Sequence, residues 1–124
     1  MNYARICQTV GSYGHAWGVQ LLDEAGKPVP LNGVSNVKFS MKLRNGTVRK
    51  VDNADGLVAN GTYTFEDGSS QTLGPTDGIL IYQPVAADVD TEGDYIGQFT
   101  YDLAGKPVIK PGCGYVEIEL QAAV

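Results

Sequence analysis

The sequence predicts an all-β fold, a sandwich of antiparallel strands, and three observations lead to it. Apolar and polar residues alternate with a period of two along much of the chain, which places successive side chains on opposite faces of a strand. Between these segments lie the 16 glycines and many Asn, Asp and Pro residues, which favour tight turns. No segment sustains the 3.6-residue apolar period of a helix. The length of 124 residues fits a single domain over residues 1–124.

Two strands are expected before residue 30. Tyr3–Val10 is the first, and the glycine-containing segment 11–14 ends it. Ala16–Leu22 is more apolar, and its only Trp residue, Trp17, is expected to be buried. The segment 23–28 follows as a turn, because it combines Asp, Gly and Pro.

A hairpin is predicted between residues 37 and 51. In Val37–Arg44 every second residue is apolar, so this strand has one buried face. Asn45-Gly46 follows directly, and this dipeptide favours a two-residue turn because both residues tolerate a positive φ. Thr47–Val51 is then the returning strand.

Residues 52–77 are predicted to be an inserted loop or β-excursion. Asp, Asn, Gly and Ser crowd this span around one expected strand, Thr62–Phe65. Long loops on compact scaffolds often carry contacts, so Tyr63 and Phe65 are candidate partner-binding residues. The alternative is a surface decoration without a role.

The second half of the chain is expected to complete the sandwich. A helical turn is predicted at Pro84–Asp88, and a tight turn at Asp102–Val108. In the last strand three apolar residues face inward and Glu117 and Glu119 face outward. The three strands expected in this half are Gly78–Tyr82, Tyr95–Tyr101 and Tyr115–Leu120.

The formal net charge is −5 at pH 7, and five of the nine Lys and Arg residues lie between Lys38 and Lys50. On the predicted hairpin they point outward, which makes Arg44 and Arg49 candidate partner-binding residues. We expect no nucleic-acid partner, because the field of an acidic chain repels polyanions. No apolar run is long enough for a membrane span, and no secretory leader pattern precedes the first strand, so we expect folding in cytoplasm and no membrane partner.

The two cysteines, Cys7 and Cys113, lie near opposite ends of the chain. In a reducing compartment two buried thiols are expected rather than a disulfide, although first and last strands often meet in a sandwich. Two such ligands do not make a zinc site.

The search for catalytic residues predicts a protein that is not an enzyme and holds no cofactor. His15 is the only histidine, and no Gly-x-Ser-x-Gly, phosphate-loop or His-Glu-x-x-His motif is present. Asp88-Val-Asp90-Thr-Glu92-Gly93 loosely matches the start of a calcium loop. The twelfth position, which should be a bidentate Glu, is Phe99, so no metal site is expected.

Three stretches carry a family resemblance. They are Val19-Gln-Leu-Leu-Asp-Glu-Ala-Gly-Lys-Pro-Val-Pro-Leu-Asn-Gly-Val-Ser-Asn-Val-Lys-Phe, Asp90-Thr-Glu-Gly-Asp-Tyr-Ile-Gly-Gln-Phe and Pro111-Gly-Cys-Gly-Tyr-Val-Glu-Ile-Glu-Leu. Together they resemble the immunoglobulin-like N-terminal domain of phage baseplate upper proteins and related small tailed-phage virion proteins. The resemblance covers most of the chain outside residues 52–77. Thr91-x-Gly93-x-Tyr95 is also similar to the tyrosine corner of immunoglobulin-type sandwiches, although Gly97 stands where antibody domains have a cysteine.

The resemblance implies an immunoglobulin-like antiparallel β-sandwich that serves as a non-catalytic virion part made in the host cytoplasm. Its expected partners are other phage virion proteins of the capsid, tail or baseplate, and homo-oligomers are possible on a symmetric shell. Baseplate upper proteins continue into a fibre-forming region and this chain does not, which favours a capsid decoration or cement protein, or a baseplate or tail adaptor. The alternative is a carbohydrate-binding module for host attachment, with Tyr63, Phe65 and Tyr82 coplanar on an open face.

Overall fold

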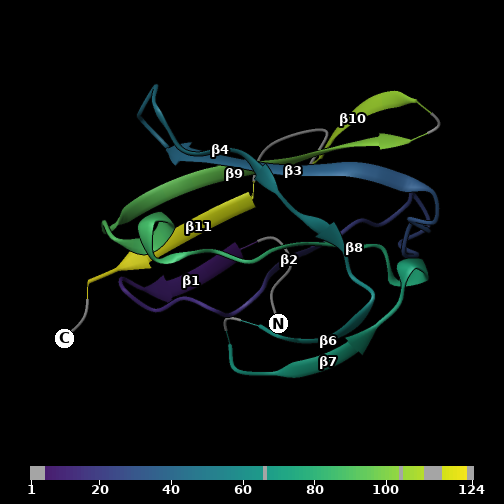
Figure 1. Cartoon of the computed structure of the whole chain (residues 1–124), viewed down its shortest axis with the longest axis horizontal. Coiled ribbons are helices and arrows are strands. Elements are labelled where there is room, and N and C mark those ends of the chain that lie inside the picture. Colours follow the sequence, from purple (N-terminus) through teal and green to yellow (C-terminus); the bar gives the residue numbers. More distant parts are fainter. Residues whose placement is uncertain (1–4, 66, 104, 111–115, 123–124) are drawn as a thin grey trace.

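A computed structural model describes residues 5–65, 67–103, 105–110 and 116–122. These residues form eleven strands and two short 3₁₀ helices, which confirms the predicted all-β class (Figure 1). In this part of the chain no helix has the length and apolar character needed to cross a bilayer.

The larger sheet has six strands in the order β1-β11-β9-β3-β4, with β10 paired to the end of β9. It contains the two longest strands, β3 and β9, which lie side by side along the molecule (Figure 1). Its strands are β1 (Arg5–Thr9), β3 (Val34–Leu43), β4 (Arg49–Asp55), β9 (Gly93–Leu103), β10 (Lys106–Lys110) and β11 (Val116–Gln121).

A smaller three-stranded sheet, ordered β2-β8-β5, provides the second layer. A separate two-stranded hairpin, β6–β7, lies on the opposite side of the molecule from β10 (Figure 1). These elements are β2 (Trp17–Gln20), β5 (Leu57–Val58), β6 (Gly61–Thr64), β7 (Ser70–Leu73) and β8 (Ile79–Tyr82), with the 3₁₀ helices η1 (Pro75–Asp77) and η2 (Ala86–Val89).

One strand pair of the larger sheet departs from the antiparallel arrangement of the others. Strand β1 pairs with β11 in parallel, with Arg5 opposite Glu117 and Thr9 opposite Gln121. A short hairpin forces its strands to be antiparallel, whereas these two strands are joined by the rest of the chain and are free to run in the same direction. The expectation that the first and last strands meet is confirmed.

The core between the two sheets is built on aromatic side chains from both of them. Phe39 of β3 stacks on Tyr82 of β8, with ring centroids 4.7 Å apart, and lies 4.9 Å from the Phe99 ring of β9. Trp17 is fully buried beside them, as expected, and its Nε1 donates a hydrogen bond to Gln8 Oε1 at 2.6 Å. The bond satisfies the indole N–H, which would otherwise be costly to bury.

The β3–β4 connection differs from the tight turn that Asn45-Gly46 predicts. The Gly46 N–H donates to the Leu43 carbonyl at 2.9 Å, neither Asn45 nor Gly46 has a positive φ, and the return strand begins at Arg49. The Arg44 N–H donates to the Asp94 carbonyl at 2.9 Å. The β3–β4 pair next to the connection is Lys42 opposite Arg49, so the connection is a wider loop than a two-residue turn.

Residues 52–77 contain more regular structure than the single expected strand. They include the end of β4, then β5, β6, β7 and η1. Phe65 and Ala59 are fully buried here, in a small cluster with Ala16, Ile79 and Ile81. This excursion is therefore packed against the smaller sheet.

The hydrogen bond expected from the tyrosine-corner pattern is present at the start of β9. The Tyr95 hydroxyl donates to the Thr91 carbonyl at 2.9 Å, and the Tyr95 side chain is buried. The predicted helical turn before it is η2, where the Asp88 carboxylate accepts hydrogen bonds from the Val85 N–H at 3.0 Å and from the Tyr82 hydroxyl.

Candidate interaction surface

One face of the larger sheet packs on the core, and its opposite face, which we call the outer sheet face, is open. Apart from the buried Ile96, its side chains alternate along the strands with buried ones. The strand register places five of the outward-facing residues in one row across the sheet. Glu117 lies opposite Arg5 of β1 and opposite Ile96 of β9. Lys42 lies opposite Ile96 and, on its other side, opposite Arg49 of β4. The outer sheet face consists of Arg5, Ser40, Lys42, Arg49, Asp94, Ile96, Gln98, Glu117 and Glu119.

One end of the outer sheet face is a network of exposed ion pairs. Arg5 contacts Glu119 at 2.8 Å and Glu117 at 3.8 Å, and Arg44 of the β3–β4 loop contacts Glu117 at 2.9 Å. Hydrogen bonds from Gln121 and Arg5 lower the pKa of Glu119 below its ordinary value. The network presents charges of both signs to solvent.

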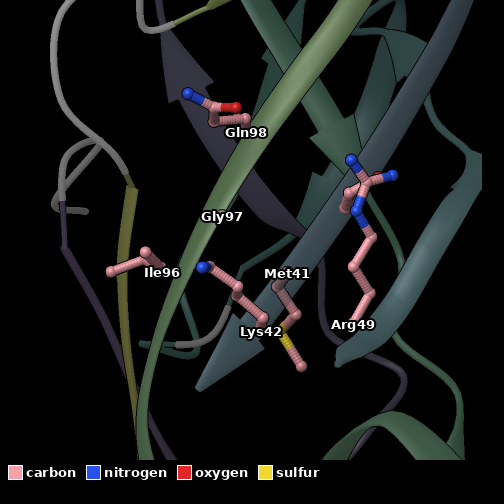
Figure 2. Close-up of a pocket in the computed structure, with 7 residues that line it drawn as sticks. Met41, Lys42, Arg49, Ile96, Gly97 and Gln98 are labelled. Atoms are coloured by element: carbon pink, nitrogen blue, oxygen red, sulfur yellow. The ribbon is translucent and has the colours of Figure 1, made fainter. Parts of the chain in front are cut away.

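The other end is a hollow of about 100 Å³ between β3, β9 and β4. Ile96 is one of its lining residues and is only 6% exposed. Figure 2 shows the Lys42 side chain reaching from β3 toward β9, with Arg49 on the far side of β3. The backbone around Met41 and Gly97 and the side chains of Ser40 and Gln98 complete the lining.

The cations of the β3–β4 hairpin are compensated by carboxylates, with one exception. Lys38 contacts Asp55, Lys50 contacts Asp90, Arg49 contacts Asp52 at 2.8 Å, and Arg44 contacts Glu117 at 2.9 Å. Among the described residues, Lys42 has no carboxylate within ion-pair distance, and its Nζ donates instead to the Gly46 carbonyl at 3.1 Å. The five cations therefore do not add up to a basic patch.

The four sequence-predicted contact residues do not lie together. Arg44 and Arg49 are exposed at the edge of the outer sheet face, as expected from the hairpin. Tyr63 and Phe65 lie in and beside β6, away from this face. The expectation that Phe65 is a surface contact is wrong, because its side chain is fully buried under Gly18 of β2.

The open aromatic row expected of a carbohydrate-binding module is not formed by the three residues proposed for it. Phe65 is 0% exposed and Tyr82 is 5% exposed. Tyr63 is half-buried, and its hydroxyl accepts a hydrogen bond from the Asn60 N–H at 3.0 Å. A sugar cannot stack on rings that the core covers.

The acidic segment around η2 does not gather its carboxylates in one place. Asp88 is buried and turned toward Tyr82, whereas Asp90 contacts Lys50 and the Thr91 hydroxyl. In the ranges that the structure describes, no three His, Cys, Asp or Glu side chains are grouped to hold a metal ion. Two carboxylates of the loose calcium-loop pattern have other roles: Asp88 caps η2, and Asp90 binds Lys50.

The expected burial of both thiols is wrong for Cys7, which is exposed on β1 between Arg5 and Thr9. Alternation of the strand explains this, because Ile6 and Gln8 take the inward positions. Cys113 lies outside the described residues, so the pairing of the two cysteines stays a prediction.

No family model matches this chain, and no curated protein sequence matches it either. The residues of the hollow are therefore defined by geometry alone. Sequence alternation placed Lys42 on the solvent side of its strand, but it did not indicate that Ile96 and Gln98 are its neighbours. That adjacency depends on the β3–β9 register, which brings together residues far apart in the chain.

Proposed function

We propose that this chain is a non-catalytic structural protein of a tailed-phage virion, a docking module that binds other virion proteins as a capsid decoration or cement protein or as a baseplate or tail adaptor. The observation that carries the docking role is the outer sheet face, an open surface with charges of both signs and a hollow beside Lys42. The virion assignment rests on the resemblance of segments 19–39, 90–99 and 111–120 to the immunoglobulin-like domain of baseplate upper proteins. The Tyr95 corner supports that resemblance.

The charges of the outer sheet face suit a docking surface because of where they lie. One end carries ion-paired charges of both signs, and the other carries a lysine without a carboxylate partner among the described residues. Complementary charge patterns contribute more to partner selection and orientation than to affinity. The Arg5–Glu117–Arg44 network and the hollow at Lys42 are distinct features at two ends of one face. A partner that matches both features is bound in a single orientation.

The edges of the larger sheet are less suited to association than its face. Strand β4 carries charged side chains and an irregular register at its edge, and β1 has only five residues. Charges, bulges and short length are the usual means by which sheets avoid unwanted strand pairing. We therefore place the contact on side chains rather than on an added strand.

The proposal is tested by mass spectrometry and immunogold labelling of purified phage particles from a lysate. Abundant label over the head supports a decoration role, and label at the tail tip supports a baseplate role. Preimmune serum on the same particles is the control. Particles that carry none of the protein overturn the virion proposal.

A further inference from the structure

We propose that the hollow on the outer sheet face binds one carboxylate side chain, an Asp or Glu of the partner protein, with Lys42 as its cation. This inference rests on the proposed docking function and deepens it by naming the chemistry of the contact. It assigns to the hollow a ligand group that accepts hydrogen bonds and carries a single negative charge.

The uncompensated charge of Lys42 is the first argument. The four other cations of the hairpin contact carboxylates of this chain, and Lys42 does not. An ammonium group has three donors, and one of them is used on the Gly46 carbonyl. An external carboxylate would take up the remaining donors and the charge.

The other polar groups of the hollow also suit an acceptor. Gln98 is one of the residues that line the hollow, and its amide has no hydrogen-bond partner among the described residues. Arg49 directs one guanidinium nitrogen to Asp52 at 2.8 Å and keeps further N–H donors free of that contact. Carboxylates accept hydrogen bonds without donating any, so they match this set of donors.

The small size of the hollow favours a small anionic group. Its volume of about 100 Å³ is small, with room for only a few water-sized groups. A carboxylate with its methylene is a small group that suits a hollow of this size.

The surroundings favour a carboxylate over a phosphate chain. Asp52, Asp55 and Asp90 lie on or against the same hairpin, and the whole chain has a net charge of −5. A polyanion would meet these charges as repulsion over its length. A single carboxylate in an otherwise neutral or mixed segment reaches Lys42 without that cost.

The test is an NMR titration of the ¹⁵N-labelled full chain with a peptide of the sequence acetyl-Gly-Ala-Glu-Ala-Gly-amide, whose only charge is the Glu carboxylate. We expect saturable shift changes centred on the backbone amides of residues 40–42, 49 and 96–98. Lys42→Met should weaken binding at least tenfold, and Lys42→Gln should weaken it similarly. Lys27→Met, which removes an exposed lysine on the 23–27 turn, is the matched control and should leave binding unchanged.

Three outcomes would overturn the inference: equal shifts with the Glu→Gln peptide, shifts centred on Arg5 and Arg44, or tighter binding of a phosphoserine peptide or an oligonucleotide at the same residues. A dispersed spectrum of each variant shows that it is folded. The titration uses no phage particles, so its failure and the absence of the protein from particles are separate results.

Discussion

At the scale of single residues, hydroxyl, amide and indole groups inside the molecule bond to partners a few residues away in sequence, whereas most ion pairs join distant segments at the surface. Trp17 bonds to Gln8, Gln8 bonds to the Ser12 carbonyl, and Tyr82 bonds to the buried Asp88. The ion pairs lie on the surface, where solvent and salt weaken them to a small net contribution. Stability should therefore respond to the loss of a buried partner more than to the loss of a surface charge.

Tyr95→Phe tests how much one buried hydrogen bond contributes to stability. The substitution removes the hydroxyl that donates to the Thr91 carbonyl at 2.9 Å and leaves the ring in place. We expect the free energy of unfolding to fall by about 1 kcal/mol. Urea denaturation should show a lower midpoint with an unchanged slope. Tyr101→Phe is the control, since that hydroxyl has no hydrogen-bond partner among the described residues, and an equal loss in both variants would contradict the role of the corner.

Gly18 packs closely against the ring of Phe65, and this contact provides a second residue-scale prediction. A Cβ at position 18 would lie 2.8 Å from Phe65 Cε1, so Gly18→Ala should cost about 1–3 kcal/mol of the free energy of unfolding. Adding Phe65→Leu should make the double variant more stable than the sum of the single effects predicts. Thermal unfolding measures both values. Gly74→Ala, where a Cβ meets no atom within 4 Å, should be close to neutral.

At the scale of elements, two irregularities shape the central strand pair. The β3–β9 register shifts between Ser35 and Lys38, and the β3–β4 register shifts on either side of Met41. An Asn with positive φ lies at each place: Asn36 at 59° and Asn53 at 51°. Each is also tied across strands, because Asn36 Nδ2 donates to Asp102 Oδ2 at 3.1 Å and the Asn53 N–H donates to Ser40 Oγ at 2.9 Å.

Asn53 should therefore tolerate glycine better than any residue with a side chain. We expect Asn53→Ala to lower the free energy of unfolding by about 1 kcal/mol, because the left-handed conformation is costly for residues with a Cβ. Asn53→Gly should cost less, and Asn53→Val should cost more than Asn53→Ala. Midpoints of urea denaturation rank the three variants. A ranking with Gly as the least stable would show that side-chain contacts of Asn53 outweigh its backbone conformation.

The same elements explain how far the sequence could predict this structure. Alternation predicted β3, β9 and β11 and their inward faces, because a strand with one buried face is encoded locally. It also located the Tyr95 corner. The parallel β1–β11 pair, the wide β3–β4 loop and the burial of Phe65 depend on contacts with distant segments, which no local pattern contains. The hollow at Lys42 was missed for the same reason.

At the scale of the whole molecule, exposed carboxylates limit the stability of the fold at low pH, and buried tyrosines limit it at high pH. Hydrogen bonds from Lys50 and Thr91 lower the pKa of Asp90, and hydrogen bonds from Gln121 and Arg5 lower that of Glu119. A lowered folded pKa contributes stability above the unfolded pKa and loses it as pH falls through the folded pKa. Burial raises the pKa of Tyr82, Tyr95 and Tyr101, so their contribution is full below the unfolded pKa and is lost as pH rises through the folded one.

The expected profile is flat around neutral pH, with a decline below the ordinary carboxyl values of 3.8 and 4.5 and another above the ordinary tyrosine value of 10.0. Urea unfolding across this pH range measures it. Salt should flatten the acid decline, because it screens exposed pairs, and leave the alkaline decline in place. Asp90→Asn should weaken the acid decline only. An alkaline decline that is equally sensitive to salt would contradict its origin in burial.

The pairing of β1 with β11 has a consequence for synthesis on the ribosome. Arg5 leaves the exit tunnel long before its partner Glu117 is translated, and β9 waits for the same strand. During that interval the nascent chain exposes an unpaired β9 edge, the kind of edge on which chains aggregate. Pairing β1 with β11 closes a loop that contains most of the chain, and the closure of long loops is also slow. Yield in the producing cell should thus depend on how well chaperones protect the chain until its last strand emerges.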